Sequence, residues 1–309
     1  MDINDCKMLM ILAEEGNVTR TAERLYIAQS SISYRLKNLE AEFGCPLFIR
    51  TKSGISFTSQ GKYLSQYAKN SWKQYLYTRE QIQTLEGCLK GDLRIGVASV
   101  LALNIFPQIL KSFHTLYPDI EIYLRSSKSN QICQMIERDE VAVALTRGEP
   151  VWGEEKDLLF EEPLGLVSTF PLEKSTLPQL PYLAHPNSNI SSTAIAWWQQ
   201  NFSVPPKTIM EIDNTDICLK MLLQGLGWSI LPAVGLSGYP TLYFKPILWA
   251  DGTPITRKTY MLYRRSNHQL PLVQIFTNYL RTTLPLCMAE ASITNIQTPF
   301  PYVPVAADQ

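Results

Sequence analysis

Hydrophobic and polar residues near the amino terminus alternate with the period of two helices joined by a short turn. Residues 18–25 form the first helix, with Asn17 before it as N-cap and the small residue Ala22 where a second helix can cross closely. A connection at residues 26–28 leads into a longer helix that stops at Gly44, a residue type that commonly follows helices. This spacing predicts a helix-turn-helix.

The longer helix has one apolar side and one polar side. Its apolar residues are spaced four, three and four apart and form one stripe that we expect to pack inward: Ile32, Leu36, Leu39 and Phe43. The opposite side carries hydroxyl, amide, phenol and cationic groups: Ser30, Tyr34 and Lys37, with Ser31, Ser33 and Asn38 beside them. These groups suit the base edges and phosphates of DNA. An ordinary amphipathic helix with a solvated polar face is the alternative.

A hairpin is expected after the longer helix. Residues 46–58 contain a turn and two short strands around a basic loop, with Arg50 and Lys52 at the tip. A hairpin beside a recognition helix is a wing, whose cations can reach the DNA backbone or the minor groove. The residues expected to contact DNA are Gln29, Ser30, Ser33 and Tyr34 at base edges, Lys37, Arg50 and Lys52 at phosphates, and Ser31 beside them.

Two further helices flank this region. Residues 3–15 are expected to form a helix whose apolar side supports the helix-turn-helix. Residues 59–89 contain no proline, which permits a helix of about seven turns. A four-three alternation along this helix is typical of a seam between paired helices: Leu64, Ala68, Ser71, Tyr75, Thr78, Ile82, Leu85 and Leu89. The alternative is a helix that lies on its own domain.

Strands and helices alternate from residue 91 onward. Strands are expected at residues 92–98, 120–124 and 141–145, with helices from Ser99 through Phe113 and at about 130–138. This alternation predicts a mostly parallel sheet with both faces covered.

A second alternating unit begins after a crossing at Pro163 and Leu164. Its expected strands are residues 164–168, 182–185, 208–212 and 225–232, and its expected helices are residues 192–202 and 216–224. The strand at 259–264 and the helix at 272–284 return to the first unit. Two lobes joined by two crossings make a hinged clamshell like that of periplasmic binding proteins.

The resulting fold class is α+β and multidomain. We expect a winged helix-turn-helix at 1–58, a linker and dimerisation helix at 59–89, and a two-lobed α/β effector-binding domain at 91–286. Lobe I comprises residues 91–163 plus about 259–286, and lobe II comprises residues 164–258. Residues 287–309 contain three prolines and no periodicity, so they are expected to form a flexible tail.

A small anion could bind between the two lobes, because ligands of such sheets bind at the carboxyl ends of strands beside helix amino termini. The candidate residues are Ser99, Val100, Ser126, Ser127, Thr146 and Arg147 from lobe I, and Ser191, Ser192, Asn214, Thr215 and Arg257 from lobe II. Arg147 and Arg257 are the main candidates, since guanidinium groups bind carboxylates with two hydrogen bonds. Helix caps are the alternative for the serines, and surface ion pairs for the arginines.

Composition refines this interpretation. Hydrophobic residues make up 45% and charged residues 18% of the 309 residues, which describes a globular protein. The net charge is zero, which by itself disfavours nucleic acid binding. Residues 1–90, however, hold 12 Lys and Arg against 9 Asp and Glu, and the remainder holds 16 against 19. This asymmetry has the sign expected for a DNA-binding head on a sensor domain.

Other classes of function find little support in the sequence. The six cysteines and three histidines show no zinc-binding spacing, and they suit buried small residues in a reducing cytosol. No signal peptide or membrane-spanning segment appears, so we expect a cytoplasmic protein without membrane contact. No catalytic motif appears either, so we do not expect an enzyme.

The sequence resembles the LysR-type transcriptional regulators. The motifs that carry the resemblance are residues 13–17 (AEEGN), 20–25 (RTAERL), 29–33 (QSSIS), Leu39 and Glu40, 44–50 (GCPLFIR), and Thr58 with Gly61. The likeness continues to about residue 285, and in this family the helix after the wing pairs two subunits. Two departures are Ala28, where the family usually has a capping serine, and Tyr34, where it often has arginine.

Within the family, four short segments look most like the citrate-responsive group of catabolite control protein C: residues 97–99 (VAS), 147–152 (RGEPVW), 197–198 (WW) and 230–232 (ILP). This likeness implies citrate or another di- or tricarboxylate as the small-molecule effector, with no other cofactor and no metal.

Three hypotheses follow. The first is a ligand-gated regulator that binds double-stranded DNA as a homodimer or homotetramer, with RNA polymerase as a further candidate partner. The second is a small-molecule binding protein whose amino-terminal module only dimerises. The third is an architectural DNA-binding protein without an effector, against which the long two-lobed remainder argues.

Overall fold

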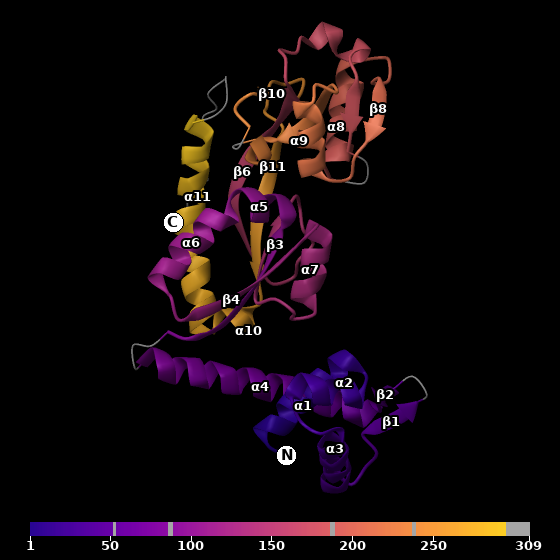
Figure 1. Ribbon diagram of the computed structural model, residues 1–309, viewed down its shortest axis with the longest axis vertical. Coiled ribbons are helices and arrows are strands. Elements are labelled where there is room, and N and C mark those ends of the chain that lie inside the picture. The colour runs from indigo at the N-terminus through magenta and orange to yellow at the C-terminus, as the bar shows by residue number, and fades with distance from the viewer. Residues whose placement is uncertain (52–53, 86–88, 186–188, 237–238, 295–309) are drawn as a thin grey trace. The chain divides into compact units, whose positions relative to one another are not determined.

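The computed structural model describes residues 1–51, 54–85, 89–185, 189–236 and 239–294. The chain divides into two compact units, Met1–Cys88 and Leu89–Gln309, and each unit has a hydrophobic core of its own (Figure 1). No helix in these ranges is long and apolar enough to cross a membrane.

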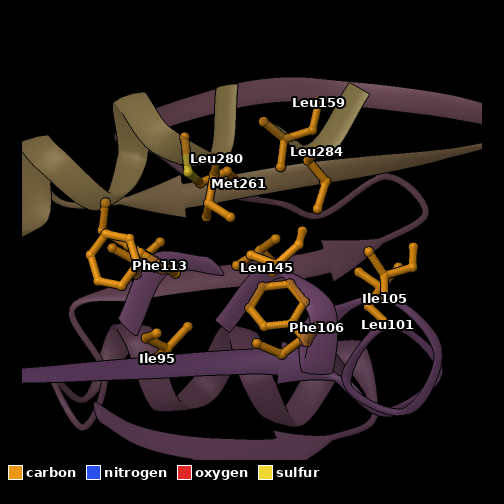
Figure 2. Close-up of a cluster of buried hydrophobic side chains, with 14 of the residues drawn as sticks. Ile95, Leu101, Ile105, Phe106, Phe113, Leu145, Leu159, Met261, Leu280 and Leu284 are labelled. Carbon is orange, nitrogen blue, oxygen red and sulfur yellow. The ribbon is translucent and has the colours of Figure 1, made fainter. Parts of the chain in front are cut away.

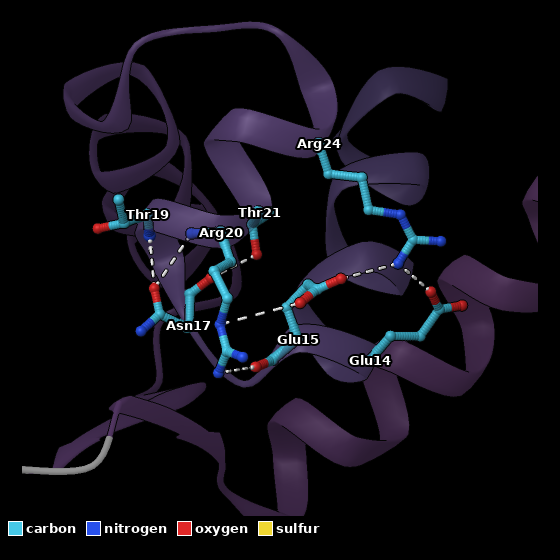
Figure 3. Close-up of polar contacts among 7 residues, drawn as sticks. All are labelled: Glu14, Glu15, Asn17, Thr19, Arg20, Thr21 and Arg24. Atoms are coloured by element: carbon cyan, nitrogen blue, oxygen red, sulfur yellow. Dashed lines mark hydrogen bonds and ion pairs between the residues drawn. The ribbon is translucent and has the colours of Figure 1, made fainter.

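The first unit begins with three helices, α1 (Ile3–Glu15), α2 (Val18–Leu25) and α3 (Gln29–Phe43). Their positions confirm the predicted helix-turn-helix and the helix before it. Asn17 caps α2, because its side-chain oxygen accepts hydrogen bonds from the backbone N–H groups of Thr19 at 2.9 Å and Arg20 at 3.1 Å (Figure 3). Ala28 precedes α3 without a side-chain cap, as the sequence indicated.

The inward stripe of α3 is shorter than predicted. Ile32, Leu36 and Leu39 are buried against residues of α1 and α2, but Phe43 is 46% exposed. Phe43 is the last residue of α3, and the buried stripe ends one turn earlier, at Leu39. Helical periodicity gives the direction of a side chain, and it cannot show where the covering partner ends.

The wing consists of β1 (Phe48–Thr51) and β2 (Gly54–Phe57), which pair antiparallel. Glu40 of α3 holds the start of the hairpin, because its carboxylate accepts the N–H groups of Leu47 at 2.9 Å and Phe48 at 3.2 Å. A Cβ atom on Gly54 would lie 2.2 Å from the carbonyl oxygen of Gly16, so only glycine permits this approach. Lys52 lies outside the described residues.

The predicted seam on the long helix α4 (Ser59–Leu85) has a buried part and an exposed part. Leu64 and Ala68 are buried in the core of the first unit, whereas Tyr75 is 42% and Ile82 54% exposed. The amino-terminal part of α4 therefore lies on its own domain, which was the alternative interpretation of the pattern. Leu89 is not helical and packs against the core of the second unit, because α4 ends before it.

Lobe I of the second unit contains the parallel strands β3 (Gly91–Ala98), β4 (Ile120–Ser127) and β5 (Val143–Arg147). Its helices are α5 (Ser99–Asn104), α6 (Phe106–Leu116) and α7 (Ser129–Glu137). The sequence predicted a single helix from Ser99 through Phe113, and the structure divides it at Ile105. Pro107 in the first turn of α6 explains the division, because proline favours a helix start and cannot donate a backbone hydrogen bond.

Lobe II contains β7 (Tyr182–Ala184), β8 (Thr208–Glu211), β9 (Trp228–Pro232) and β10 (Tyr243–Pro246). Its helices are α8 (Asn189–Asn201) and α9 (Thr215–Leu223), with the 3₁₀ turns η1 (Lys174–Gln179) and η2 (Ala233–Leu236). Strands β7 and β8 are parallel, as are β7 and β9. The carboxyl ends of these three strands therefore meet at one edge.

Two long strands join the lobes. They are β6 (Glu155–Ser168) and β11 (Thr256–Tyr263), which pair antiparallel within a sheet of order β4-β3-β5-β11-β6-β9-β7-β8, with β10 on β6. The predicted crossing is confirmed, since Pro163 lies opposite Thr256 of β11 and Leu164 opposite Pro232 of β9. Both strands are longer than predicted. Strand β6 continues past Pro163 into lobe II, and β11 begins at Thr256, with a register shift against β6 between Thr259 and Tyr260.

A third contact also connects the lobes. The core of lobe I contains Phe106, Phe113 and Met261 (Figure 2), and Val234 of η2 in lobe II is buried in the same cluster. The lobes thus share core packing in addition to the two crossing strands.

The chain returns to lobe I through α10 (Arg265–His268) and α11 (Pro271–Thr294). The prediction that structure ends near Pro285 is wrong, because α11 continues nine residues beyond it. A proline inside a helix removes one backbone hydrogen bond, and the burial of Leu284 and Met288 in the lobe I core offsets that loss. Residues 295–309 of the expected tail lie outside the described residues.

Two nearby residues on this extension of α11 differ in how much of their surface is exposed. Met288 is 5% exposed and Leu286 is 65% exposed. We expect Met288→Ala to lower the free energy of unfolding by about 2–5 kcal/mol, because it leaves a cavity in the core. Leu286→Ala is the matched control and should change it by no more than about 0.5 kcal/mol. Urea denaturation of the full chain, with hydrogen exchange measured in peptides of lobe I, gives the free energy of unfolding of both variants. Equal effects of the two substitutions would favour the predicted helix that ends near Pro285.

Candidate DNA-binding surface and anion site

The residues predicted to contact DNA lie on the exposed side of α3. Gln29, Ser30, Ser31 and Lys37 are exposed, Tyr34 is 67% exposed and Ser33 is half-buried. Gln29 donates a hydrogen bond from its amide nitrogen to the hydroxyl of Ser33 at 3.3 Å. The amide and hydroxyl groups thus present both donors and acceptors at the amino-terminal end of α3.

A groove between α3 and the wing brings four of the predicted residues together. It has a volume of about 350 Å³, and Ser33, Tyr34 and Lys37 line it from α3 while Arg50 lines it from β1. Leu36, Phe48 and Ile55 contribute apolar walls. Glu40 also lines the groove, and its carboxylate accepts the N–H groups of Leu47 and Phe48. The two cations, Lys37 and Arg50, outnumber this one engaged carboxylate, which favours a phosphate or another anion over a neutral ligand.

Ion pairs connect α2 to the carboxyl-terminal end of α1. Arg24 of α2 contacts the carboxylates of Glu14 and Glu15, the latter at 3.1 Å, and Arg20 lies 3.9 Å from Glu15 (Figure 3). These partners raise the pKa of Arg24, although partial burial opposes them. Arg20 and Arg24 are therefore engaged within the domain.

The lobe I candidates meet at the carboxyl ends of parallel strands. Ala98, which precedes Ser99, lies opposite Ser127 in the sheet, and Arg147 ends the neighbouring strand β5. Ser126 and Ser127 are the last residues of β4, whereas the sequence placed them after the strand. Ser127 is hydrogen-bonded to Gln131 within lobe I. Val100 is half-buried and packs against the lobe I core.

The lobe II candidates lie at helix starts. Ser191 and Ser192 are inside the first turn of α8, and the prediction that they precede the helix is wrong by a few residues. Asn214 is the N-cap of α9, because its side-chain oxygen accepts N–H groups of Asp216 at 2.9 Å and Ile217 at 3.1 Å. Asn214 thus has a capping role, which we considered as the alternative for the serines only.

Arg147 and Arg257 come together at the lobe crossing. Arg257 lies within β11, not before it, because this strand begins at Thr256. In the sheet, Arg257 is opposite Glu162 of β6, and Thr259 is opposite Arg147 of β5. These four positions bring the two predicted arginines onto neighbouring strands beside a carboxylate that we had not predicted.

This cluster is buried, which contradicts the alternative of surface ion pairs. Arg147 is 3% and Glu162 2% exposed, and the two side chains form an ion pair. Glu162 also accepts the backbone N–H of Val234 at 2.6 Å, so the carboxylate connects both lobes. The described residues thus supply two guanidinium groups and a single paired carboxylate at this position.

Burial affects both arginines. Desolvation, together with the charge of Arg257, holds the pKa of Arg147 well below its usual value, and desolvation lowers the pKa of Arg257 to about 10. The Nε atoms of both arginines and the hydroxyl of Thr259 are buried without a hydrogen-bond partner among the described residues. Unpaired buried donors beside excess positive charge are what a bound anion would satisfy.

Two groups of lobe II lie near this cluster. His185 follows β7 and is 6% exposed, and burial and the charge of Arg257 lower its pKa to about 4, although Asp213 acts in the opposite direction. Asp213 itself follows β8 and accepts a hydrogen bond from Lys128 of lobe I at 3.0 Å. Across the described ranges, no three His, Cys, Asp or Glu side chains gather as metal ligands.

Sequence reasoning missed Glu162, His185 and Thr259. His185 and Thr259 had a weak signal, because each is a polar residue inside a predicted strand. Glu162 had only its place directly before the predicted crossing at Pro163. Neither periodicity nor composition could show that these residues share a site with Arg147.

A winged helix-turn-helix on one unit and a two-lobed α/β domain with a buried cationic cluster on the other define a ligand-responsive DNA-binding regulator. Comparison with known families agrees with this class. Residues 3–62 match the bacterial regulatory helix-turn-helix domain of the lysR family, and residues 87–285 match the LysR substrate binding domain. The chain belongs to the LysR family of DNA-binding transcriptional regulators and has the effector-binding domain of that family.

Two similar relatives are proteins of Bacillus subtilis. The uncharacterized HTH-type transcriptional regulator YraN is 34% identical over 91% of this chain and 98% of its own length. The uncharacterized HTH-type transcriptional regulator YkuM is 31% identical over 92% of this chain and 98% of its own length. The family and these relatives are transcriptional regulators, as the first of the three hypotheses expects, and not enzymes.

Solved structures show the same fold. A full-length OxyR variant from Pseudomonas aeruginosa matches with a TM-score of 0.68 and 19% identity, covering 91% of this chain and 95% of OxyR. Full-length CbnR in complex with its target DNA matches with a TM-score of 0.55 and 18% identity, covering 91% of this chain and 99% of CbnR.

The low pKa of His185 predicts a pH dependence of stability. Between pH 6.5 and about 4 the unfolded chain binds a proton at this histidine and the folded chain does not, so the free energy of unfolding falls with falling pH in this window. The loss approaches roughly 3 kcal/mol. Urea denaturation across this pH range should give a flatter profile for His185→Gln, whereas His114→Gln, at an exposed site, should follow the wild type. Parallel profiles for all three proteins would contradict the assignment.

Proposed function

We propose that α3 reads the operator and that cations of α3 and the wing hold the DNA backbone. Gln29, Ser30, Ser33 and Tyr34 contact base edges, with Ser31 beside them, and Lys37, Arg50 and Lys52 contact phosphates. The groove shared by Ser33, Tyr34, Lys37 and Arg50 supports this assignment, because hydrogen-bonding groups and cations converge there.

The effector is an organic acid that binds at the lobe crossing. The observation that carries this proposal is the pair of guanidinium groups at the crossing. Arg147 is buried and ion-paired with Glu162, and Arg257 is half-buried on the neighbouring strand, in register with Glu162. A ligand carboxylate accepts the unpaired N–H groups of the arginines and the hydroxyl of Thr259. Ser99 and Ser127 at strand ends of lobe I, and Ser191 and Ser192 in the first turn of α8, are further candidate contacts for the acid. Citrate and other di- or tricarboxylates are the proposed effectors.

Binding of the acid changes DNA binding or bending. An anion that neutralises the cluster favours one arrangement of the two lobes, and the DNA-binding units of an oligomer respond through their attached helices. The regulator acts in the cytoplasm as a homodimer or homotetramer. It binds double-stranded DNA at its promoter, and RNA polymerase is a further partner. The exposed Tyr75 and Ile82 of α4 support pairing along this part of the helix.

DNA binding tests the first part. On DNA from upstream of the protein's own gene, Lys37→Ala should weaken binding to operator and unrelated DNA alike and reduce the salt slope by about one, because it removes one phosphate contact. Tyr34→Ala should cost about 1–3 kcal/mol on the operator and little on unrelated DNA. Lys7→Ala is the charge-matched control, since Lys7 lies over the ring of Trp72 on α4. A Tyr34 effect that is equal on both DNAs would remove the base-reading role.

Thermal stabilisation by citrate tests the second part. Arg257→Gln should abolish it, because the variant lacks a guanidinium group in the cluster. Thr259→Val is nearly isosteric and removes a hydroxyl without a partner among the described residues, so the empty protein should keep its stability or gain about 1 kcal/mol. Citrate affinity should nevertheless fall about tenfold. If citrate and a panel of other organic acids leave the wild-type melting temperature unchanged, the anion site is refuted.

A further inference from the structure

An exposed ion pair connects the two lobes directly. Lys128 of lobe I lies between β4 and α7, and Asp213 of lobe II lies between β8 and α9. The Nζ atom of Lys128 is 3.0 Å from Oδ2 of Asp213, and the two side chains are 65% and 70% exposed. The contact thus joins residues 85 positions apart in the sequence at the surface of the effector domain.

Lys128 stands beside the anion site on the lobe I side. It follows Ser127, and the hydroxyl of the next residue, Ser129, accepts the backbone N–H of Arg147 at 3.0 Å. The turn that carries Lys128 therefore also holds the end of β5, where the buried guanidinium group begins. Lys128 is a third cation at this edge, and unlike Arg147 it reaches solvent.

Asp213 stands beside the anion site on the lobe II side. The preceding residue, Ile212, donates its N–H to the carbonyl of Ala184 at 2.8 Å, which places Asp213 next to His185 in space. His185 lowers the pKa of Asp213, and Lys128 lowers it more strongly through the hydrogen bond. The pKa of His185 in turn responds to Arg257. On the lobe I side the hydrogen bond of Ser129 joins the turn of Lys128 to Arg147, and on the lobe II side Asp213 adjoins the buried His185.

The ion pairs Arg147–Glu162 and Lys128–Asp213 differ in how much their removal would cost. The Arg147–Glu162 pair is buried, and removing one partner would leave an uncompensated charge. The Lys128–Asp213 pair is exposed, contributes little to stability and is screened by salt. A carboxylate supplied by a ligand can therefore replace Asp213 on Lys128 far more readily than it can replace Glu162 on Arg147.

We propose that Lys128 and Asp213 form an electrostatic clasp across the mouth of the anion site, and that an effector with two acidic groups opens the clasp by placing its outer group on Lys128. This proposal rests on the proposed function, in which Arg147 and Arg257 bind the inner carboxylate. Lys128 then determines specificity, because an acid with one carboxylate fills the buried end and leaves the clasp closed.

The test compares acids of different charge on the full chain. Isothermal titration with citrate, succinate and propionate measures the affinity for three, two and one carboxylates. Lys128→Gln should weaken citrate and succinate about tenfold, the equivalent of one charge-assisted hydrogen bond, and leave propionate unchanged. Asp213→Asn should strengthen citrate and succinate several-fold, because the competing carboxylate is gone, and again leave propionate unchanged.

The double variant separates the clasp from independent effects. In Lys128→Gln/Asp213→Asn, the gain from Asp213→Asn should vanish, because the competition needs Lys128. The matched control is the exposed pair of Lys90 and Asp119, at 3.5 Å, which lies at the start of β3 and β4. Lys90→Gln and Asp119→Asn remove the same charges and should change none of the three affinities.

Hydrogen exchange tests the clasp without any ligand. Asp213→Asn should speed exchange in peptides covering residues 127–131 and 212–216, and Asp119→Asn should not. Any one of three results overturns the proposal. They are an equal loss of affinity for propionate and citrate in Lys128→Gln, weaker citrate binding in Asp213→Asn, and unchanged hydrogen exchange of both peptides in Asp213→Asn. Absence of binding by all three acids to the wild type would overturn the proposed function and this inference together, whereas binding that Arg257→Gln abolishes and Lys128→Gln leaves intact would overturn the inference alone.

Discussion

The buried ion pair between Arg147 and Glu162 is the contact around which the proposed anion site is built. Its partners come from β5 and β6, and Glu162 also accepts the N–H of Val234, whose side chain lies in the core of lobe I. Taking charges out of water is costly, and this pair offsets the cost for one guanidinium group only. Arg257 on β11 adds a second cation that is half-buried, so the crossing of the lobes carries positive charge that an anion can balance.

The topology explains why this charge lies where a ligand can reach it. In each lobe the parallel strands end at the edge that faces the crossing, and β6 continues from its pairing with β11 to its pairing with β9 in lobe II. Strand ends leave polar side chains and helix starts without ladder partners, which is why such edges bind ligands in open α/β sheets. The shared core residue Val234 limits how far the lobes can separate near the crossing, so any opening is easiest at the mouth.

Local patterns predicted most of the elements, and the errors about burial have one cause. Asn17, Ala28 and Gly44 showed where helices begin and end, because caps depend on neighbouring residues. Phe43, the seam of α4 and the end of α11 were misjudged, since burial depends on a partner far away in the sequence. The same reason applies to the site: Arg147 and Arg257 were chosen for their chemistry, but Glu162, His185 and Thr259 join them only through strand register.

The anion site therefore has two poles of different physical character. At the buried pole, low dielectric strengthens every charge interaction, so the arginines can supply most of the affinity for any carboxylate. At the exposed pole, water and salt weaken the Lys128–Asp213 pair, so it can be exchanged for a ligand group at small cost. Affinity set by buried charges and selectivity set by exposed ones can change independently. A change at Lys128 or Asp213 can then alter the preferred acid while the buried cluster and the fold around it stay intact.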